Sequence, residues 1–293
     1  MSYFGFLVCF LVVPLAALLL FQRWKISFSG KASGYQGGKA PWLAIAVQVA
    51  LAVLYTTPWD NYLVANGVWT YSHAQVSGVL LGYVPLEEYT FFVLQAVLVG
   101  ILWQVCAAWL YPKGSFQALP SIRIWFSGAG AALWGCSLAL LFSVWQQFTY
   151  LGLILAWALP PIMLQLAFGA DILWQRRRLL AVLILVPGLY LSTADALAIK
   201  MGIWSISPTQ STGLFVGALP LEEGVFFFVT VMLLAFGMTL SLAPESTTRL
   251  ESLCRWLRKR RKLLTRKPRE HTPPSGTARA PATADYGEGG DPL

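Results

Sequence analysis

Long apolar stretches separated by short polar segments run through the chain. A bilayer core of about 30 Å needs about 20 mostly apolar residues for each spanning helix. Seven stretches meet this requirement, and they are continuously apolar, without the alternation of a membrane β-strand. We therefore predict seven transmembrane helices, at approximately Tyr3–Phe21, Pro41–Thr57, Pro85–Tyr111, Trp125–Trp145, Phe148–Phe168, Leu179–Ile199 and Pro220–Ala243.

The composition agrees with a membrane protein. Hydrophobic residues make up 57% of the 293 residues and charged residues only 12%, against roughly a quarter charged in soluble domains. The first apolar run has no basic segment before it and no clear cleavage site, so we expect it to be retained as the first helix. The four cysteines show no C-x-x-C spacing, and we predict neither a disulfide framework nor a metal site.

The basic residues predict the orientation in the membrane. Every Lys and Arg except Lys200 lies after the first, third, fifth or seventh predicted helix. By the positive-inside rule the N-terminus is outside and the C-terminus is cytoplasmic, in a multi-pass protein of a bacterial or archaeal cytoplasmic membrane. This placement also explains the net charge of +8, so we expect no nucleic-acid partner.

The chain contains an internal repeat. A shift of 135 residues, without gaps, aligns 60–92 with 195–227, and thirteen of the 33 positions are identical. The identical pairs are Asp60/Asp195, Gly67/Gly202, Trp69/Trp204, Ser72/Ser207, Gln75/Gln210, Gly78/Gly213, Gly82/Gly217, Pro85/Pro220, Leu86/Leu221, Glu87/Glu222, Glu88/Glu223, Phe91/Phe226 and Phe92/Phe227. Helices one to three thus correspond to helices five to seven. The fourth helix restores the orientation of the second copy, so the repeats are parallel.

These patterns predict an all-α integral membrane fold of two parallel three-helix repeats joined by a linker helix. We expect a first unit at 1–111, a linker with the fourth helix at 112–146, a second unit at 147–243 and a tail at 244–293. In the tail, Leu250, Leu253, Trp256 and Leu257 beside a basic run suggest an amphipathic helix on an anionic inner leaflet. From Pro268 onward the composition predicts disorder.

The Pro-Leu-Glu-Glu motif at 85–88 and 220–223 is the most informative chemical feature. Proline and glutamate in a first helical turn are common helix-start signals, so a structural role is one interpretation. However, an ionised side chain in a span costs roughly 2.5–3.5 kcal/mol, which makes such groups functional candidates. Adjacent glutamates point about 100° apart, so one could face a cavity while the other holds the helix end. Our candidate catalytic residues are Glu87, Glu88, Glu222 and Glu223.

Carboxyl groups close together in an apolar site do not all ionise at neutral pH. Such a cluster holds a protonated acid beside a carboxylate, the equipment for adding a proton at one place and removing it at another. Asp60 and Asp195, at the outer ends of helices two and six, are either helix-end residues or supporting polar partners of the glutamates.

The aromatic residues of the repeat permit two interpretations. They could belong to the interfacial belt or to ordinary packing. In a site that forms a carbocation, aromatic faces would stabilise the positive charge without reacting with it. The residues concerned are Trp69, Trp204, Phe91, Phe92, Phe226 and Phe227.

The duplicated Pro-Leu-Glu-Glu followed by Phe-Phe, a Trp in each preceding loop and the three-helix units resemble the membrane-embedded lycopene cyclase domain family. In that family two units act as separate small proteins or are fused with a linker helix, as in this chain. The resemblance covers about residues 1–243. It implies a lipophilic carotenoid substrate and cyclisation of the ψ-ends of lycopene to β-rings, giving γ-carotene and then β-carotene. The reaction is an isomerisation without net redox change, metal or cofactor.

The resemblance also implies a mechanism. A protonated glutamate adds a proton to C2, the C5–C6 double bond attacks the cation at C1, and a carboxylate removes a proton from C6. We expect one composite site between the two repeats. Because both motifs face one leaflet, two rings would require release and rebinding through a one-ring intermediate.

Alternatives remain open at this stage. Within the family, the substrate could be an elongated fifty-carbon carotenoid, the enzyme could stop after one ring, or the ring could be ε. From another class, duplicated helices with membrane carboxylates suit a proton-coupled transporter. A retinal protein is disfavoured because the seventh helix has no lysine. The sequence leaves the oligomeric state open.

Overall fold

The computed structural model describes residues 1–28, 39–112 and 114–264. The chain divides into two compact units, Met1–Arg249 and Leu250–Leu293. The first unit holds every strand of the described chain and all of its long apolar helices.

Seven segments of the described chain are long and apolar enough to span a membrane, which confirms the predicted helix number and the all-α class. The first combines α1 (Tyr3–Leu7), the π-helical η1 (Val8–Val12) and α2 (Val13–Phe28). The others are α3 (Lys39–Ala65), α4 (Leu86–Leu110), α5 (Pro120–Leu141), α6 (Thr149–Gln175), α7 (Arg177–Lys200) and α8 (Leu221–Leu242). A short 3₁₀ turn, η2 (Gln146–Phe148), precedes α6, and α9 (Pro244–Leu264) follows α8.

Several helix boundaries differ from those expected, including the end of the first span at Phe28 and the end of α5 at Leu141. Helix α3 continues past Thr57 to Ala65, because Pro58 removes one N–H donor without ending the helix. Helix α6 continues past a non-helical Gly169 to Gln175. Helix α5 starts at Pro120, five residues earlier than expected, since proline is suited to a first helical turn.

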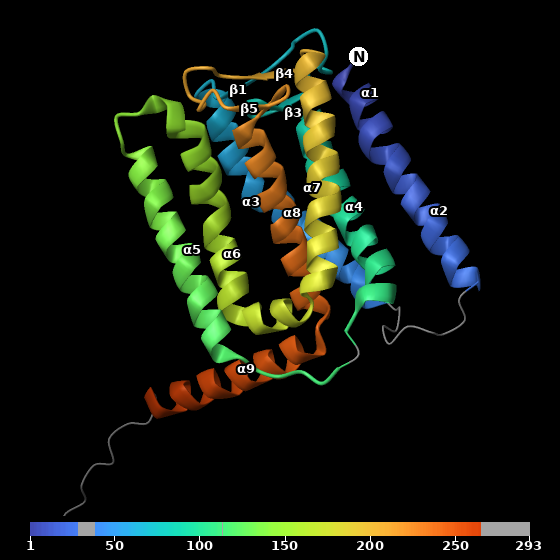
Figure 1. Ribbon diagram of the computed structural model, residues 1–293, viewed down its shortest axis with the longest axis vertical. Helices are drawn as coiled ribbons and strands as arrows, with labels where there is room; N and C mark the ends of the chain where they lie inside the picture. The colour runs from blue at the N-terminus through green and yellow to red at the C-terminus, as the bar shows by residue number, and fades with distance from the viewer. Residues whose placement is uncertain (29–38, 113, 265–293) are drawn as a thin grey trace, which may run out of the picture. The chain divides into compact units, whose positions relative to one another are not determined.

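The two repeats meet through the segments that link their second and third helices. In the first repeat these are β1 (Trp69–Tyr71), β2 (Leu80–Leu81) and β3 (Val84–Pro85); in the second they are β4 (Trp204–Ile206), β5 (Phe215–Val216) and β6 (Leu219–Pro220). Strand β1 pairs antiparallel with β4, while β2 pairs with β3 and β5 with β6. Since β1 and β4 come from different repeats and pair at one end of the bundle, the repeats are parallel (Figure 1).

Glycines explain part of the identity between the repeats. Gly67, Gly78 and Gly82 have φ of 65°, 81° and 73°, and their counterparts in the second repeat have φ of 68°, 71° and 66°. Side chains disfavour this left-handed region, so both loops need glycine at the same three places.

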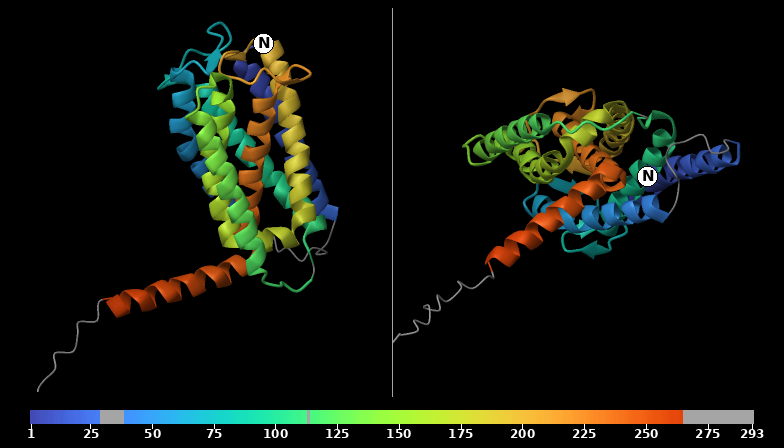
Figure 2. Two further views of the ribbon diagram at one scale, coloured as in Figure 1. Left: turned by 60° about the vertical axis from the view of Figure 1, so that its left-hand side comes forward. Right: turned by 90° about the horizontal axis from the view of Figure 1, so that it is seen from below.

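The central helices carry most of the buried side chains, whereas α5 packs along α6 at the margin (Figure 2). Only 11% of the apolar window of α5 is buried, against 56% for both α4 and α8. A linker that restores orientation needs no large buried face. Between the repeats, Gln95 on α4 donates a hydrogen bond to Thr230 on α8 at 3.0 Å.

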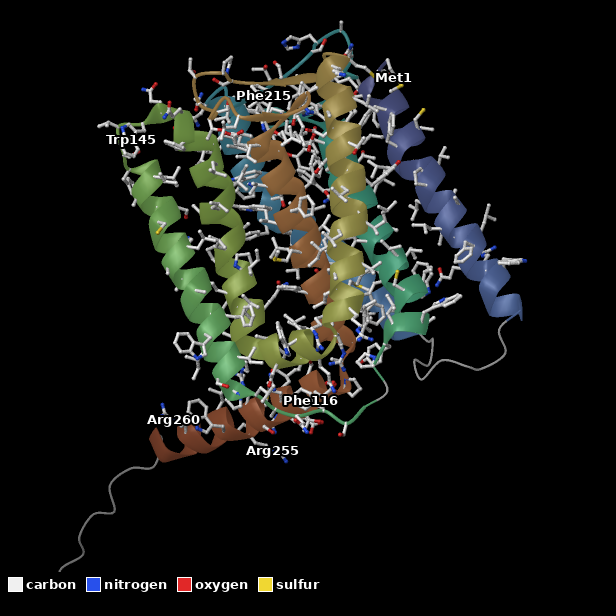
Figure 3. The ribbon with its side chains drawn as sticks, viewed as in Figure 1. Met1, Phe116, Trp145, Phe215, Arg255 and Arg260 are labelled. Atoms are coloured by element: carbon white, nitrogen blue, oxygen red, sulfur yellow. The ribbon has the colours of Figure 1, made fainter. Side chains whose placement is uncertain are left out.

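The two ends of the first unit differ in chemistry. Met1, Trp145 and Phe215 lie at the end with the paired loops, and Phe116 lies at the other (Figure 3). Ion pairs Arg176–Glu245 and Arg249–Asp171, both 2.8 Å, join the ends of α6 and α9.

In the second unit, residues 250–264 are helical, as expected for the start of the tail. Leu250, Leu253, Trp256 and Leu257 are exposed, and Arg260 lies over the ring of Trp256 at 4.4 Å. The disorder expected from Pro268 onward lies outside the described residues.

Candidate active site

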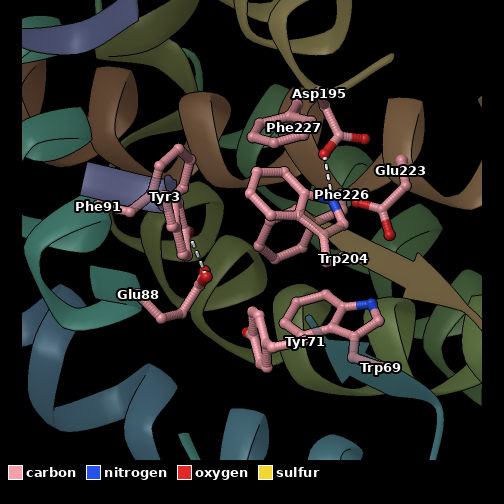
Figure 4. A pocket seen from close by; sticks show the side chains of 10 residues that line it. All are labelled: Tyr3, Trp69, Tyr71, Glu88, Phe91, Asp195, Trp204, Glu223, Phe226 and Phe227. Carbon is pink, nitrogen blue, oxygen red and sulfur yellow. Dashed lines mark hydrogen bonds between the residues drawn. The ribbon is translucent and has the colours of Figure 1, made fainter. Parts of the chain in front are cut away.

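A cavity lies beneath the paired loops, between the two repeats (Figure 4). The space between its atoms, including the part open to solvent, is about 340 Å³. Ten side chains line it, and none of the ten is basic: Tyr3, Trp69, Tyr71, Glu88, Phe91, Asp195, Trp204, Glu223, Phe226 and Phe227.

The second glutamate of each motif faces this cavity. Figure 4 shows Glu88, from α4, and Glu223, from α8, on two sides of the aromatic cluster. The hydroxyl of Tyr3 donates a hydrogen bond to Glu88 Oε2 at 2.5 Å, and the hydroxyl of Tyr150 donates to Glu223 Oε1 at 2.6 Å. Both carboxyl groups therefore have one oriented partner from the first helix of their own repeat.

The backbone fixes these two tyrosines. The amide of Tyr3 donates to the carbonyl of Gln75 at 2.8 Å, and the amide of Tyr150 donates to the carbonyl of Gln210 at 3.0 Å. The two carbonyls occupy equivalent positions in the two loops. Each loop therefore anchors the start of a helix and fixes the position of its tyrosine.

The first glutamate of each motif has a different environment. Glu87 Oε1 accepts the backbone N–H of Ser77, and Glu222 Oε1 accepts that of Thr212, both at 2.5 Å. Both glutamates are 0% exposed and lie outside the cavity lining. They hold the loops against the starts of α4 and α8. The members of each pair thus point to different faces, as the helical geometry predicted.

The two aspartates are buried in the last turns of their helices. Asp195 lines the cavity, and its Oδ1 accepts a hydrogen bond from Trp204 Nε1 at 2.9 Å. Asp60 is 0% exposed and does not line the cavity; neither of its carboxyl oxygens has a hydrogen-bond partner among the described residues. Asp60 lies inside α3 because that helix extends beyond the predicted end.

Five of the six aromatic residues selected from the repeat line the cavity. Phe92 is the exception: it is buried and packs against Phe91 with a ring-centroid separation of 6.4 Å. Tyr71 also lines the cavity, close to Glu88. Burial and the nearby charges of Asp60 and Glu88 raise the pKa of Tyr71 well above its usual value, so its hydroxyl keeps its proton.

Tyr3, Tyr71 and Tyr150 were missed at the level of sequence. A signal for two of them exists, because a shift of 147 residues aligns Tyr3, Gly5 and Pro14 with Tyr150, Gly152 and Pro161. The single shift of 135 hid this match, since the link between the first and second helices is longer in the first repeat. Tyr71 has no such signal, as its counterpart is Ile206.

The cavity combines three carboxyl groups with aromatic walls. Glu88, Asp195 and Glu223 share an apolar space, where carboxyl groups do not all ionise together. Such a site can give a proton to an apolar molecule, stabilise a cation on ring faces and take a proton back. Among the described residues, no group of three or more His, Cys, Asp or Glu side chains is arranged to hold a metal ion.

Comparisons with known proteins point in one direction. The family model described as lycopene cyclase matches residues 2–106 and 135–241. A lycopene beta-cyclase of Halobacterium salinarum is 43% identical over 240 residues, covering 82% of this chain and 95% of the relative. Bifunctional lycopene cyclase/phytoene synthases of Leptosphaeria maculans and Aspergillus oryzae are 35% and 28% identical, covering 66% and 77% of this chain but 35% and 37% of the relatives. No solved structure gave a significant match.

Proposed function

The chain belongs to the lycopene cyclase family, and from this premise we propose that it cyclises the ψ-ends of lycopene to β-rings in the membrane. The observation that carries the proposal is the pair Glu88 and Glu223, each bonded to a tyrosine, in one aromatic-lined cavity. The reaction is an isomerisation in carotenoid biosynthesis, so the proton added at the start is balanced by the proton removed at the end.

Glu88 and Glu223 are the proposed acid and base. The protonated carboxyl adds its proton to C2 of the terminal double bond, which leaves a cation at C1. The C5–C6 double bond attacks C1 to close the ring and moves the cation to C5. The ionised carboxyl then removes the proton from C6, which restores the C5–C6 double bond. Asp195, which shares the cavity, is the supporting carboxyl.

Glu87 and Glu222 act as positioning residues in this proposal. Their bonds to the loop amides support it, because these bonds fix the helix starts that carry Glu88 and Glu223. Asp60 is buried close to Glu88 and is the second supporting polar residue. The ring faces of Trp69, Trp204, Phe91, Phe226 and Phe227 stabilise the cation.

We also propose an orientation with the N-terminus outside and the C-terminus in the cytoplasm. The distribution of basic residues supports it, and so does the odd number of spans in the described chain. Exposed Leu250, Leu253, Trp256 and Leu257, next to the basic sequence that follows Cys254, suit binding to anionic lipids of the inner leaflet.

The test is expression of this chain in bacteria that accumulate lycopene, followed by chromatography of the extracted pigments over time. We expect γ-carotene to appear first and β-carotene later, because one composite site processes one end of the substrate at a time. β-Carotene without γ-carotene at any time or enzyme level would contradict the single site. Unchanged lycopene, with the protein present in the membrane, would overturn the proposed substrate.

A further inference from the structure

A second cavity adjoins the active-site cavity, between the first helix and α7. It shares Phe91, Asp195, Trp204 and Phe227 with the first, and the space between its atoms is about 230 Å³. Beyond these shared residues, its walls are entirely apolar. They come from the first helix and α7: Phe6, Phe10, Leu11, Leu191 and Ala194.

The equivalent place in the other repeat is filled. The 135-residue shift puts Trp59 where Ala194 lies, and the 147-residue shift puts Trp157 where Phe10 lies. Trp59 stacks on Trp157 at a centroid distance of 4.6 Å and on Phe226 at 5.7 Å. Its Nε1 also donates to the carbonyl of Leu153 at 3.1 Å. A hydrogen-bonded indole stack thus occupies the space that Ala194 leaves open.

The backbones of the two sides are nevertheless braced in the same way. Pro14 and Pro161 lack the N–H that would bond the carbonyl four residues earlier. The carbonyl of Phe10 instead accepts a hydrogen bond from the hydroxyl of Tyr190 at 2.9 Å. The carbonyl of Trp157 likewise accepts one from the hydroxyl of Tyr55 at 2.8 Å. Tyr190 and Tyr55 are themselves equivalent under the 135-residue shift. Because this bracing is shared, the open and filled sides differ mainly in their side chains.

From this asymmetry we propose that the polyene chain of the substrate lies in the passage beside Ala194, between the first helix and α7, while its reacting end occupies the active-site cavity. The inference rests on the proposed function. The ten side chains of the active-site cavity can surround only the reacting end of a forty-carbon polyene, so the rest must leave through an apolar opening. The passage beside Ala194 has apolar walls, whereas Trp59 and Trp157 close the equivalent route.

The first test adds an indole to the open side. Ala194→Trp copies the residue of the filled side, and Thr193→Trp is the matched control because Thr193 is exposed on the same helix. We expect Ala194→Trp to lower lycopene conversion by about tenfold or more, since it displaces the bound polyene. Thr193→Trp should stay within about twofold of the parent. Conversion by Ala194→Trp at the parental rate, with equal protein in the membrane, would overturn the proposal.

The second test avoids any dependence on folding of a bulky variant. Ala194→Cys is purified in its folded state and treated with benzyl methanethiosulfonate, which adds a benzyl group through a disulfide that a reducing agent removes. We expect loss of conversion after treatment and recovery after reduction, with mass spectrometry confirming both steps. The parent and Thr193→Cys, treated alike, should keep their activity.

The outcomes separate the two proposals. A parent chain that leaves lycopene unchanged would overturn the function and the passage together. An active parent would retain the function. The passage would then be overturned if the thiol introduced by Ala194→Cys stayed unmodified, or if the benzylated variant converted lycopene normally.

Discussion

The two halves of the active site share their polar groups and differ in what surrounds them. Glu88 with Tyr3 matches Glu223 with Tyr150, and both loops are held by a buried glutamate. The apolar flanks differ: Trp59 of the first repeat is the equivalent of Ala194 in the second.

The difference separates two kinds of constraint. The polar groups depend on loop carbonyls, loop amides and helix starts, so a change in one of them misplaces a buried carboxyl group. The apolar flanks only have to fill space or leave it open. The two repeats therefore share the acid pair, whereas their apolar walls differ, with Trp59 in one and Ala194 in the other.

The largest expected effect tests whether the two halves form one site. Glu88→Gln and Glu223→Gln keep side-chain size but remove the acid or base, so each should lower conversion by about 10²–10⁴-fold. Pigment analysis at matched protein levels measures this. If each half worked alone, either single variant would retain about half of the activity and only the double variant would lose it.

Glu87→Gln and Glu222→Gln are the matched controls. A glutamine carbonyl still accepts the loop amide of Ser77 or Thr212, so the positioning bond survives. We expect losses below about tenfold for these variants. A loss as large as that of Glu88→Gln would instead assign proton transfer to the first glutamates.

The tyrosine substitutions should have a smaller effect than Glu88→Gln and Glu223→Gln. Tyr3→Phe and Tyr150→Phe each remove one hydrogen bond to a buried carboxyl group, worth about 1.5–3 kcal/mol when one partner is charged. That corresponds to a loss of conversion of about 10–100-fold. The larger loss is expected for the tyrosine bonded to the carboxyl group that acts as the base, because a hydrogen bond to an ionised acceptor is stronger than one to a neutral acceptor.

Rates measured on purified protein at saturating lycopene would check this prediction. Unequal losses would assign the base to the carboxyl group bonded to the more sensitive tyrosine, whereas equal losses would contradict a division into one acid and one base. Unchanged rates in both variants would contradict the role of the hydroxyls.

The sequence predicted the helix number, the repeat and the glutamate pairs because each leaves a strong local signal. Apolar length indicates a span, and identical residues at a fixed shift indicate equivalent positions. The same shift also marked Phe92, which packs against Phe91 and does not line the cavity. A repeat identifies equivalent residues, but it does not state which face of a helix meets the cavity.

Other features of the site depend on tertiary structure. The predicted helix ended at Thr57, yet α3 continues to Ala65 and carries Asp60 into the interior. Tyr3 and Tyr150 meet the glutamates only after two helices pack, over separations of 85 and 73 residues. The contrast between Trp59 and Ala194 is visible in the alignment, but its meaning requires the stacked rings and the neighbouring cavity.

The smallest expected effect concerns the loops that carry the motifs. In the first repeat Asn61 accepts the amide of Tyr83 at 2.8 Å and donates to Tyr89, whose hydroxyl donates to the carbonyl of Leu81 at 2.8 Å. The equivalents of Asn61 and Tyr89 in the second repeat are Ala196 and Gly224, which have no such side chains. The first loop is therefore braced by a polar network that the second lacks.

Gly82→Ala and Gly217→Ala test whether this polar network stabilises the first loop. Both glycines have positive φ, so each alanine should cost about 1–2 kcal/mol of stability. At Gly82 the new methyl group also collides with the Asn61 side chain, whereas at Gly217 it meets no atom within 4 Å. Displacing Asn61 weakens its bond to Tyr83, which adds about 1 kcal/mol.

Thermal unfolding in detergent should therefore show the larger loss for Gly82→Ala. In an Asn61→Ala background the two glycine substitutions should cost the same, since the collision is gone. Equal losses in the parental background would mean that the network does not hold the first loop.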